Sequence, residues 1–410
     1  MKLQSPKNLA PLESRLTFPA GFFWGAATSA HQVEGGNHND WSEWEKVTRH
    51  EESGRACDHY NRFREDFDIA KSLGHNAHRF SIEWSRIEPE EGKFNEKEIA
   101  HYQEVIDALR ERGIEPFVTL WHWTLPVWVA KQGGWENKKT IDDFTRYVDK
   151  IVRSLKSVTY WMPLNEPGTF VGLGYIQGSR PPQVKNLTRA NRAFKNLMAA
   201  HRQAYDIIHK VNDGALVGTA NYAVHMTPYK NLPWNWLLIK ILDYVRNWRF
   251  FATLNNKFDF IGIQYYHTDV INLKLGKGRW GPIELKNPND WVSDIGWWIY
   301  PEGIYHLLKR AARYGKPIFI TENGVADAGD IYRERFIKEM LRWIYQATSE
   351  GVDVRGYFYW SLLDNFEWDS GFTQRFGLVE INYKTMERKI RKSALEYAKI
   401  AKENAVETDP

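Results

Sequence analysis

The feature that most constrains the fold is an alternation of short apolar runs with longer stretches of helical period. Two of the longer stretches, 95–113 and 333–351, are amphipathic and end in a glycine suited to a helix C-cap. Eight of the short runs have the length and composition of buried strands: 22–28, 76–82, 115–121, 158–164, 215–221, 258–266, 317–323 and 354–361. Strands that alternate with helices predict a parallel sheet, and eight such units close most naturally into a (β/α)8 (TIM) barrel.

The length of the chain agrees with one barrel. A barrel of this kind takes roughly 200 to 400 residues as a single domain. For a chain of 410 residues we therefore expect one α/β domain over 1–410, with its core at about 18–400 and loose terminal tails. Hydrophobic residues make up 43% and charged residues 26% of the chain, which is typical of an ordered globular protein.

Charge and cysteine content exclude several classes of protein. The 55 Lys and Arg are interspersed among 51 Asp and Glu, so the sequence has no basic stripe for nucleic acid. The only cysteine, Cys57, cannot form an internal disulfide, which fits a reducing compartment, and we expect a cytoplasmic protein. No apolar run reaches the length of about 18 residues that predicts a membrane span.

Two segments allow a second interpretation. Residues 17–30 contain a short apolar stretch and small residues like those of a signal peptide, but Pro19 and Gly21 interrupt it and no basic leader precedes it, so we expect a core strand. Residues 231–251 are rich in Trp, Leu and basic residues, like a helix that lies in a membrane interface. A helix packed on the barrel explains the same pattern, and Asp243 favours packing.

Polar or aromatic residues stand at or just beyond the end of every predicted strand. A barrel gathers the carboxyl ends of its strands on one face, which is where functional groups of this fold lie. Helix caps and solvated loops also place polar residues after strands, so the argument depends on their convergence. The residues are Gln32, Arg79, His122, Asn165 with Glu166, Asn221, Tyr266, Glu322 and Trp360.

Two of these residues are glutamates in similar surroundings. Glu166, in MPLNEPG, follows the fourth predicted strand, and Glu322, in PIFITENG, ends the seventh. In an eight-stranded barrel these two ends face each other across the mouth. A lone glutamate at such a position is more often part of a buried ion pair. Two opposed carboxylates are the groups that glycoside hydrolysis needs, one to protonate the leaving oxygen and one to attack or to activate water.

Eight motifs stand along the chain in the order FPAGFFWGAATSAHQVEG, NAHRFSIEWSRIEP, VTLWHWTLPVW, LNEP, DFIGIQYY, GWWIYPEGIY, ITENG and YFYWSLLDNFEW. This series resembles the signatures of glycoside hydrolase family 1, the β-glucosidase-like retaining enzymes. The resemblance extends from about residue 18 to about residue 400, and the series is much more specific than an isolated NEP or ENG.

The resemblance implies that Glu166 is the general acid/base and Glu322 the nucleophile of a retaining hydrolysis. The two carboxyl groups are then expected about 5 to 5.5 Å apart. Arg79 and Tyr266 can stabilise the charge on Glu322, so we expect them to lower its pKa. Glu166 must stay protonated, which its apolar strand and the charge on Glu322 favour.

The resemblance also implies a sugar-binding set. A pyranose presents hydroxyl groups around an apolar face, so its site needs amides, carboxylates and an aromatic platform. Asn165 would bind the 2-hydroxyl, Trp360 would be the platform and Trp297 the wall on the leaving-group side. Trp123 is either a further wall or a packing residue. The hydrogen-bonding set is Gln32, His122, Asn165, Glu367 and Trp368.

Glu367 points to a subclass. Relatives that act on 6-phosphorylated sugars have serine at this position, with lysine and tyrosine a few residues further on. This chain has Glu367, Gln374 and Phe376 there. A carboxylate repels a phosphate dianion, so we expect unphosphorylated β-glycosides, with Phe376 near the C6 of the sugar.

Three residues depart from the family pattern. Pro163 stands where threonine is usual, and a proline inside the fourth strand would remove a hydrogen-bond donor. Gln264 replaces an asparagine before the two tyrosines, and its longer side chain could shift contacts near the leaving group. Ile295 replaces a common methionine, which we interpret as packing. Pro163 and Gln264 leave the substrate preference open.

Other functions remain possible alternatives. A catalytically silent sugar-binding barrel would be expected to lack one of the glutamates, and a cellulase-like barrel would have an open groove. Residues 38–52 contain His and acids without regular metal-ligand spacing, so we expect a solvated loop and neither a metal nor a cofactor. The expected partner is a small β-glycoside or oligosaccharide. The sugar epimer, the aglycone, transglycosylation and the oligomeric state are left open.

Overall fold

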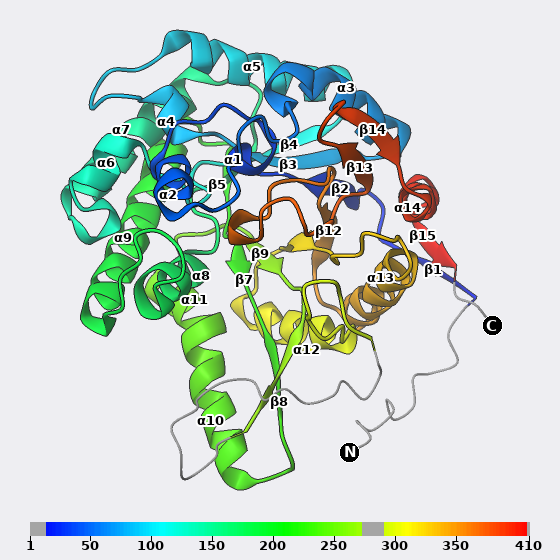
Figure 1. The fold of residues 1–410 in the computed structure, drawn as a ribbon. Coiled ribbons are helices and arrows are strands. Elements are labelled where there is room, and N and C mark those ends of the chain that lie inside the picture. Colours follow the sequence, from blue (N-terminus) through cyan, green and yellow to red (C-terminus); the bar gives the residue numbers. More distant parts are fainter. Residues whose placement is uncertain (1–13, 273–290, 408–410) are drawn as a thin grey trace.

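A curled parallel sheet forms the centre of the protein in the computed structural model, which describes residues 14–272 and 291–407 (Figure 1). Its neighbouring strands follow the order β6-β5-β4-β3-β2-β12-β11-β9-β7, and every pair is parallel. The strands are β2 (Phe23–Ala27), β3 (Ala77–Ser81), β4 (Glu115–Thr119), β5 (Tyr160–Met162), β6 (Leu216–Val217), β7 (Asn221–Tyr222), β9 (Ile261–Gln264), β11 (Ile318–Asn323) and β12 (Val354–Trp360).

The two ends of this sheet come from one segment of the chain. The prediction of a single strand over 215–221 is wrong, because the segment divides into β6, which pairs with β5, and β7, which pairs with β9. Between them Gly218 forms a bridge with Phe260, and a Cβ on Gly218 would lie only 2.0 Å from the Phe260 ring. The backbone must therefore bend closely over this ring. Counted as one strand, β6 and β7 complete the predicted (β/α)8 barrel.

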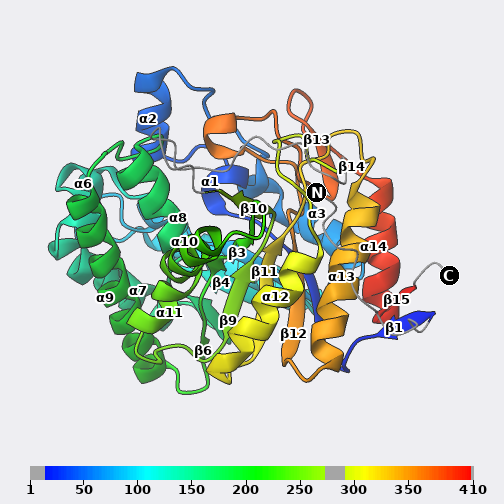
Figure 2. The same ribbon diagram turned by 90° about the horizontal axis from the view of Figure 1, so that it is seen from below.

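Helices surround the sheet on its outer side (Figures 1 and 2). Two of them, α5 and α13, confirm the helices predicted at 95–113 and 333–351, and Gly113 and Gly351 both have the positive φ of a C-terminal cap residue. The longer helices are α3 (His59–Ser72), α5 (Glu96–Glu111), α7 (Lys139–Ser154), α9 (Leu187–Val211), α12 (Glu302–Ala311), α13 (Arg333–Ser349) and α14 (Lys392–Glu403).

Shorter elements lie in the connections and near the chain ends. The short helices are α1 (Ala30–Val33), α2 (Asp40–Thr48), α4 (Trp84–Ile87), α6 (Val127–Lys131) and α8 (Pro167–Val171). Within the described part of the chain, two-stranded sheets are formed by β1 (Arg15–Thr17) with β15 (Ala405–Glu407), β8 (His225–Pro228) with β10 (Thr268–Ile271), and β13 (Val379–Asn382) with β14 (Glu387–Ile390). The expectation of loose tails outside about 18–400 is wrong for their inner parts, because β1 and β15 pair with each other, whereas residues 1–13 and 408–410 lie outside the described residues. The single-domain organisation stays a prediction.

Aromatic side chains fill the inside of the barrel. Phe117 stacks on Tyr160 with ring centroids 4.1 Å apart. Phe260 and Phe319 approach the ring of Phe117 edge to face. This cluster is continuous with Trp360 and other aromatic residues at the carboxyl ends of the strands. The barrel is therefore a packed core that supports those strand ends, not an open channel.

The interpretation of residues 38–52 as a solvated loop is wrong. Asn39 caps α2 through a reciprocal hydrogen-bond pair with Ser42, and Trp41 and Trp44 are both buried. The ring of Trp41 lies 4.5 Å from that of Trp368. The spacing of three between the two tryptophans places them on one face of a helix, and this apolar face outweighs the surrounding charges.

Two further expectations need adjustment. The core strand expected within 17–30 is β2, but it covers only Phe23–Ala27, and α1 follows it directly. Pro163 lies one residue beyond β5, so it takes no hydrogen-bond donor out of the strand itself.

The segment 231–251 is helical, and only one of its faces packs on the protein. It forms α10 (Pro233–Asp243), a π-helical turn (Tyr244–Trp248) and α11 (Arg249–Thr253). The expected packing is thus correct for one side only, as the outer side exposes large apolar side chains. Among the residues that the structure describes, no helix combines the length and the apolar character needed to cross a bilayer.

Candidate active site

Glu322, near the end of β11, is a buried carboxylate with three hydrogen-bond donors. Its Oε1 accepts from the guanidinium of Arg79 and, at 2.8 Å, from Gln264 Nε2. Its Oε2 accepts from the phenol of Tyr266 at 2.6 Å. Burial raises the pKa of Glu322 above its ordinary value, while Arg79 and Tyr266 act in the opposite direction. The expected lowering by these two residues is present, but burial outweighs it.

Glu166 is a second buried carboxyl and has no cation in contact among the described residues. It precedes α8, and its backbone is left-handed, with φ 43° and ψ 54°. Burial raises the pKa of Glu166 well above its ordinary value, and the charge on Glu322 raises it further. Because the pKa of Glu166 is raised more than that of Glu322, Glu166 keeps its proton in conditions where Glu322 is ionised.

The left-handed backbone of Glu166 is strained. Backbone strain of this kind costs about 1–3 kcal/mol and persists where surrounding contacts impose it.

Asn165 connects the residues on both sides of Glu322. Its Oδ1 accepts hydrogen bonds from Arg79 Nη2 at 2.6 Å and from Gln264 Nε2 at 2.8 Å. Its Nδ2 lies 3.0 Å from Nε2 of His122. Burial lowers the pKa of His122 well below its ordinary value, with Arg79 acting in the same direction, so this ring is neutral.

This arrangement leaves hydrogen-bond donors of His122 and Asn165 without a protein partner among the described contacts. Since Asn165 donates to Nε2 of His122, the proton of the neutral ring lies on Nδ1. That nitrogen is buried and has no protein partner among the described residues. The second hydrogen of the Asn165 amide is likewise not used by the contacts above.

Glu367 and Gln32 form a second group of polar side chains in the candidate site. Gln32 donates to the carbonyl of Phe366 at 2.9 Å and reaches Oε2 of Glu367 at 3.4 Å. Burial raises the pKa of Glu367 to about 7, and Arg180 opposes this rise. The indole of Trp360, at the end of β12, is nearly parallel to the ring of His122, with centroids 6.2 Å apart.

Aromatic rings enclose these polar groups. Trp297 lies 5.6 Å from Tyr266 and 6.3 Å from Phe376, measured between ring centroids. Trp123 and Trp368 lie 4.7 Å apart. The structure therefore gathers the predicted residues on one face, at the carboxyl ends of the strands: Gln32, Arg79, His122, Trp123, Asn165, Glu166, Tyr266, Trp297, Glu322, Trp360, Glu367, Trp368 and Phe376.

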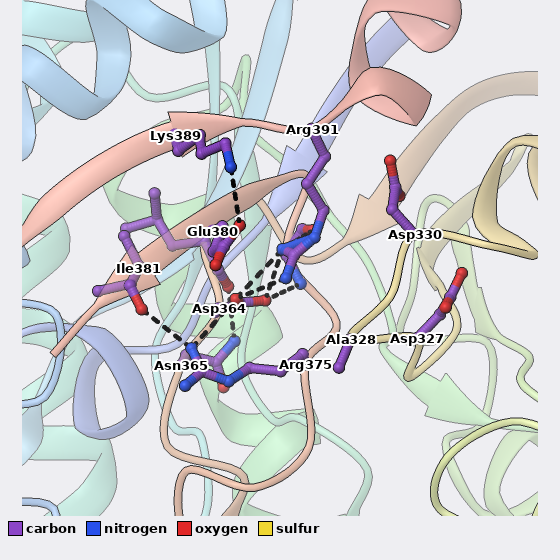
Figure 3. Close-up of polar contacts among 12 residues, drawn as sticks. Asp327, Ala328, Asp330, Asp364, Asn365, Arg375, Glu380, Ile381, Lys389 and Arg391 are labelled. Atoms are coloured by element: carbon purple, nitrogen blue, oxygen red, sulfur yellow. Dashed lines mark hydrogen bonds and ion pairs between the residues drawn. The ribbon is translucent and has the colours of Figure 1, made fainter.

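The segment that carries Glu367, Trp368 and Phe376 is anchored by a buried carboxylate (Figure 3). Asp364 forms ion pairs with Arg391 at 3.1 Å and with Arg375 at 3.2 Å, and it accepts a hydrogen bond from the amide of Gly377. Figure 3 shows both guanidinium groups directed at this one carboxylate. Asp364 thus joins the two ends of the loop that follows β12, which fixes the position of the residues between them.

Within residues 14–272 and 291–407, no group of three or more His, Cys, Asp or Glu side chains has the arrangement of a metal site. Asn221, the remaining residue at a strand end, donates to the backbone carbonyl of Asn247 and is structural.

The sequence model of glycosyl hydrolase family 1 matches residues 14–238 and 249–406. The chain belongs to glycosyl hydrolase family 1. This is a family of retaining glycosidases that act on β-glycosides, and its members share the TIM barrel.

Named relatives include both glucosidases and galactosidases. The chain is 34% identical to Beta-glucosidase A of Acetivibrio thermocellus, over 95% of this chain and 99% of that protein. It is 30% identical to a Beta-galactosidase of Sulfolobus acidocaldarius, over 95% of this chain and 96% of that protein.

Solved family 1 structures superpose on the whole fold. The beta-glycosidase from Pyrococcus horikoshii has a TM-score of 0.91 and 38% identity, with 96% of each chain covered. The beta-glucosidase from Thermotoga maritima in complex with glucoimidazole has a TM-score of 0.89 and 31% identity, with 95% of this chain and 99% of that chain covered.

Arg180 is a residue of this family 1 site that the sequence did not reveal. Its Nη2 pairs with Asp369 at 2.5 Å, and its guanidinium lies 5.3 Å from the ring centroid of Trp123. Its charge opposes the upward pKa shifts of both Glu166 and Glu367. The segment GSRPPQ has no recognisable motif, and only the fold brings Arg180 to Asp369, so no sequence signal could have identified the pair.

Replacing Asp364 tests the anchor. In Asp364→Asn, Arg391 and Arg375 lose their shared counter-charge while Arg391 stays buried, so we expect the free energy of unfolding to fall by about 3–5 kcal/mol. Glu380→Gln is the matched control, because Glu380 and Lys389 form an exposed pair at 4.0 Å, visible in Figure 3, and exposed pairs contribute about 0–1 kcal/mol. Urea denaturation measures both, and equal losses would contradict the anchoring role.

Replacing Arg180 tests its effect on Glu367. Arg180→Gln removes the charge that opposes protonation, so the pKa of Glu367 should rise above about 7. If Glu367 binds sugar hydroxyls as a carboxylate, inhibition by the free sugar at pH 7 should weaken several-fold and recover at higher pH. Arg180→Lys keeps the charge and should keep the pH dependence of the wild type. The inhibition constant of glucose or galactose, measured from pH 5 to pH 9, decides this, and an unchanged profile in Arg180→Gln would refute it.

Proposed function

We propose that this family 1 enzyme is an exo-acting β-glycosidase that removes terminal, unphosphorylated β-linked sugars from small glycosides through a covalent glycosyl-enzyme. The observation that carries the proposal is the contrast between two buried carboxyl groups. Glu322 has Arg79, Gln264 and Tyr266 as donors, whereas Glu166 has no cation in contact among the described residues. Retaining hydrolysis needs this combination of an ionised nucleophile and a protonated acid.

In the first step Glu322 attacks the anomeric carbon. The bond from that carbon to the leaving oxygen breaks, and Glu166 gives its proton to this oxygen, so the aglycone leaves as a neutral alcohol. A carboxylate oxygen of Glu322 becomes the ester oxygen of the glycosyl-enzyme. Arg79 and Tyr266 hold the carboxylate in one orientation for the attack.

In the second step the roles of Glu166 reverse. Formation of the ester removes the negative charge of Glu322, and this charge is one cause of the raised pKa of Glu166. The pKa of Glu166 then falls, so its carboxylate can take a proton from the water that attacks the anomeric carbon. The sugar is released with its original configuration, and Glu322 is regenerated as a carboxylate.

The polar groups around the carboxylates suit a neutral sugar. We assign the contact with the 2-hydroxyl to Asn165, and further hydroxyl contacts to His122, Gln32, Glu367 and Trp368. Trp360 is assigned as the platform for the apolar face of the ring, with Trp297 and Trp123 as walls on the leaving-group side. Phe376 in place of a tyrosine, and a carboxylate at Glu367, argue against a phosphorylated sugar.

Glucosides and galactosides are both candidate substrates, because the named relatives include enzymes for each. Thermotoga maritima beta-glucosidase structures are complexes with glucoimidazole and with deoxynojirimycin, which supports small sugars as ligands of the site. A cytoplasmic location is part of the proposal, supported by the single cysteine: Cys57 is buried and donates to the carbonyl of Asp364.

The nucleophile assignment predicts that Glu322→Gln loses at least about 10⁴-fold in kcat, since no covalent intermediate can form. Azide should not restore hydrolysis with retained configuration in this variant. Hydrolysis of a nitrophenyl β-glucoside measures the rate, and NMR of the first product gives its anomeric configuration. A rate close to that of the wild type would refute the role of Glu322.

The acid/base assignment predicts a loss that depends on the leaving group. Glu166→Gln should lose about 10²–10⁴-fold with poor leaving groups and much less with dinitrophenol, which needs no protonation. In the wild type, kcat/KM should fall at low pH as Glu322 gains a proton and at high pH as Glu166 loses one. The high-pH fall should disappear in Glu166→Gln with the activated substrate. An equal loss across leaving groups, or an unchanged high-pH limb, would count against this role.

A further inference from the structure

The outer side of α10 and of the π-helical turn after it exposes a row of large apolar side chains, which we call the α10 face. Each is between 43% and 62% exposed. Most recur at intervals of three or four residues along one side of the helix, and Figure 1 shows α10 projecting from the edge of the barrel. The α10 face consists of Trp234, Trp236, Leu237, Ile241, Tyr244 and Val245.

The opposite side of the helix accounts for its attachment to the protein. Ile239 packs in a small cluster with residues of β8 and β10. Asp243 accepts hydrogen bonds from Asn247 at 2.7 Å and from Trp248 at 2.9 Å, and it forms an ion pair with Arg310. The larger apolar side chains thus point away from the barrel, which is the reverse of a helix that only packs on its own domain.

The family match stops and restarts inside this region. It covers 14–238 and 249–406, so residues 239–248, which include half of the α10 face, lie outside it. Both catalytic carboxyl groups lie within the matched ranges. The shared family core therefore gives no reason for the apolar side chains at 241, 244 and 245.

Most charged residues of the segment that carries the α10 face are basic. Residues 229–250 contain four basic residues, Lys230, Lys240, Arg246 and Arg249, and only one acid, Asp243. Asp243 is buried and already paired with Arg310, and Arg246 is paired with Asp269 at 2.6 Å. Lys230 and Lys240 are exposed, so the surface beside the apolar row is cationic.

We propose that the α10 face binds the surface of a lipid bilayer that contains anionic lipids. Tryptophan and tyrosine favour the boundary between head groups and acyl chains, and the aliphatic residues beside them gain by leaving water. Exposed lysines beside such a row are attracted to anionic head groups. The helix would lie in the interface and would not span the bilayer, in agreement with its length of 11 residues.

A second copy of the chain is a less suitable occupant. Two α10 faces related by a two-fold axis would bring the same surface together, and with it Lys240 and its symmetry mate. No exposed acid within 229–250 could neutralise them. Like charges at an interface oppose association, whereas an anionic bilayer complements the same charges.

Vesicle sedimentation tests the proposal with the full chain. The probes are vesicles of phosphatidylcholine alone and of phosphatidylcholine with phosphatidylglycerol. We expect the protein to sediment at least about 10-fold more with the anionic vesicles, and less as salt is added, because salt screens surface charges. Trp234→Ser, Leu237→Gln and Ile241→Gln combined should abolish this binding, and Lys240→Glu should weaken it several-fold.

A matched control separates the α10 face from apolar exposure in general. Leu187→Gln, Ile331→Gln and Leu395→Gln change three exposed apolar residues elsewhere, and this variant should bind like the wild type. Hydrolysis of a nitrophenyl β-glucoside reports whether each variant is folded, since none of these residues belongs to the site.

Two results would overturn the proposal. The first is equal sedimentation of the wild type and the triple α10 variant, including the absence of vesicle binding by both. The second is a doubled mass in sedimentation equilibrium that the triple α10 variant abolishes, without vesicle binding, since the occupant would then be a second copy. Binding that the control variant keeps and the α10 variant loses supports the proposal. Neither overturning result would affect the catalytic assignments.

Discussion

The contact of Arg79 with Glu322 and Asn165 is the interaction on which the rest of the site depends. The guanidinium lies on β3 and reaches Asn165, beyond the end of β5, and Glu322 on β11, so it connects three distant segments. A fully buried cation is tolerable only with a hydrogen-bonded counter-charge, and here the counter-charge is Glu322, the proposed nucleophile. The same contact therefore fixes both the position and the charge of Glu322.

Two rigid supports hold this contact in place. Below it, the aromatic core of the barrel fills the space under the strand ends, where Phe260 and Phe319 pack edge to face on Phe117. Beside it, Asp364 with its two arginines fixes the loop that carries Glu367 and Trp368. Catalytic groups must be held within a fraction of an ångström, and such supports reduce the reorganisation that binding would otherwise require.

The strands and the two glutamates could be predicted because their signals are local. An apolar run followed by a polar residue and a turn is visible in the sequence at both Glu166 and Glu322. The break in the fifth strand was not visible, because it arises from the contact of Gly218 with Phe260, 42 positions later. The helix at 40–48 was missed for a different reason: abundant charges concealed the spacing of Trp41 and Trp44. Arg180 and Asp369 meet only in the folded chain.

The proposed division of roles between Glu166 and Glu322 does not require the pKa of Glu322 to lie below its ordinary value. From the sequence we expected donors to lower it, and burial proves stronger. Burial acts on both carboxyl groups, however, so it shifts both pKa values upward and does not change which of the two is higher. Of the two carboxyl groups, Arg79 and Tyr266 contact only that of Glu322, and the charge of Glu322 adds to the upward pKa shift of Glu166. Catalysis depends on the difference between the two values, and that difference is set by which carboxyl group the arginine contacts.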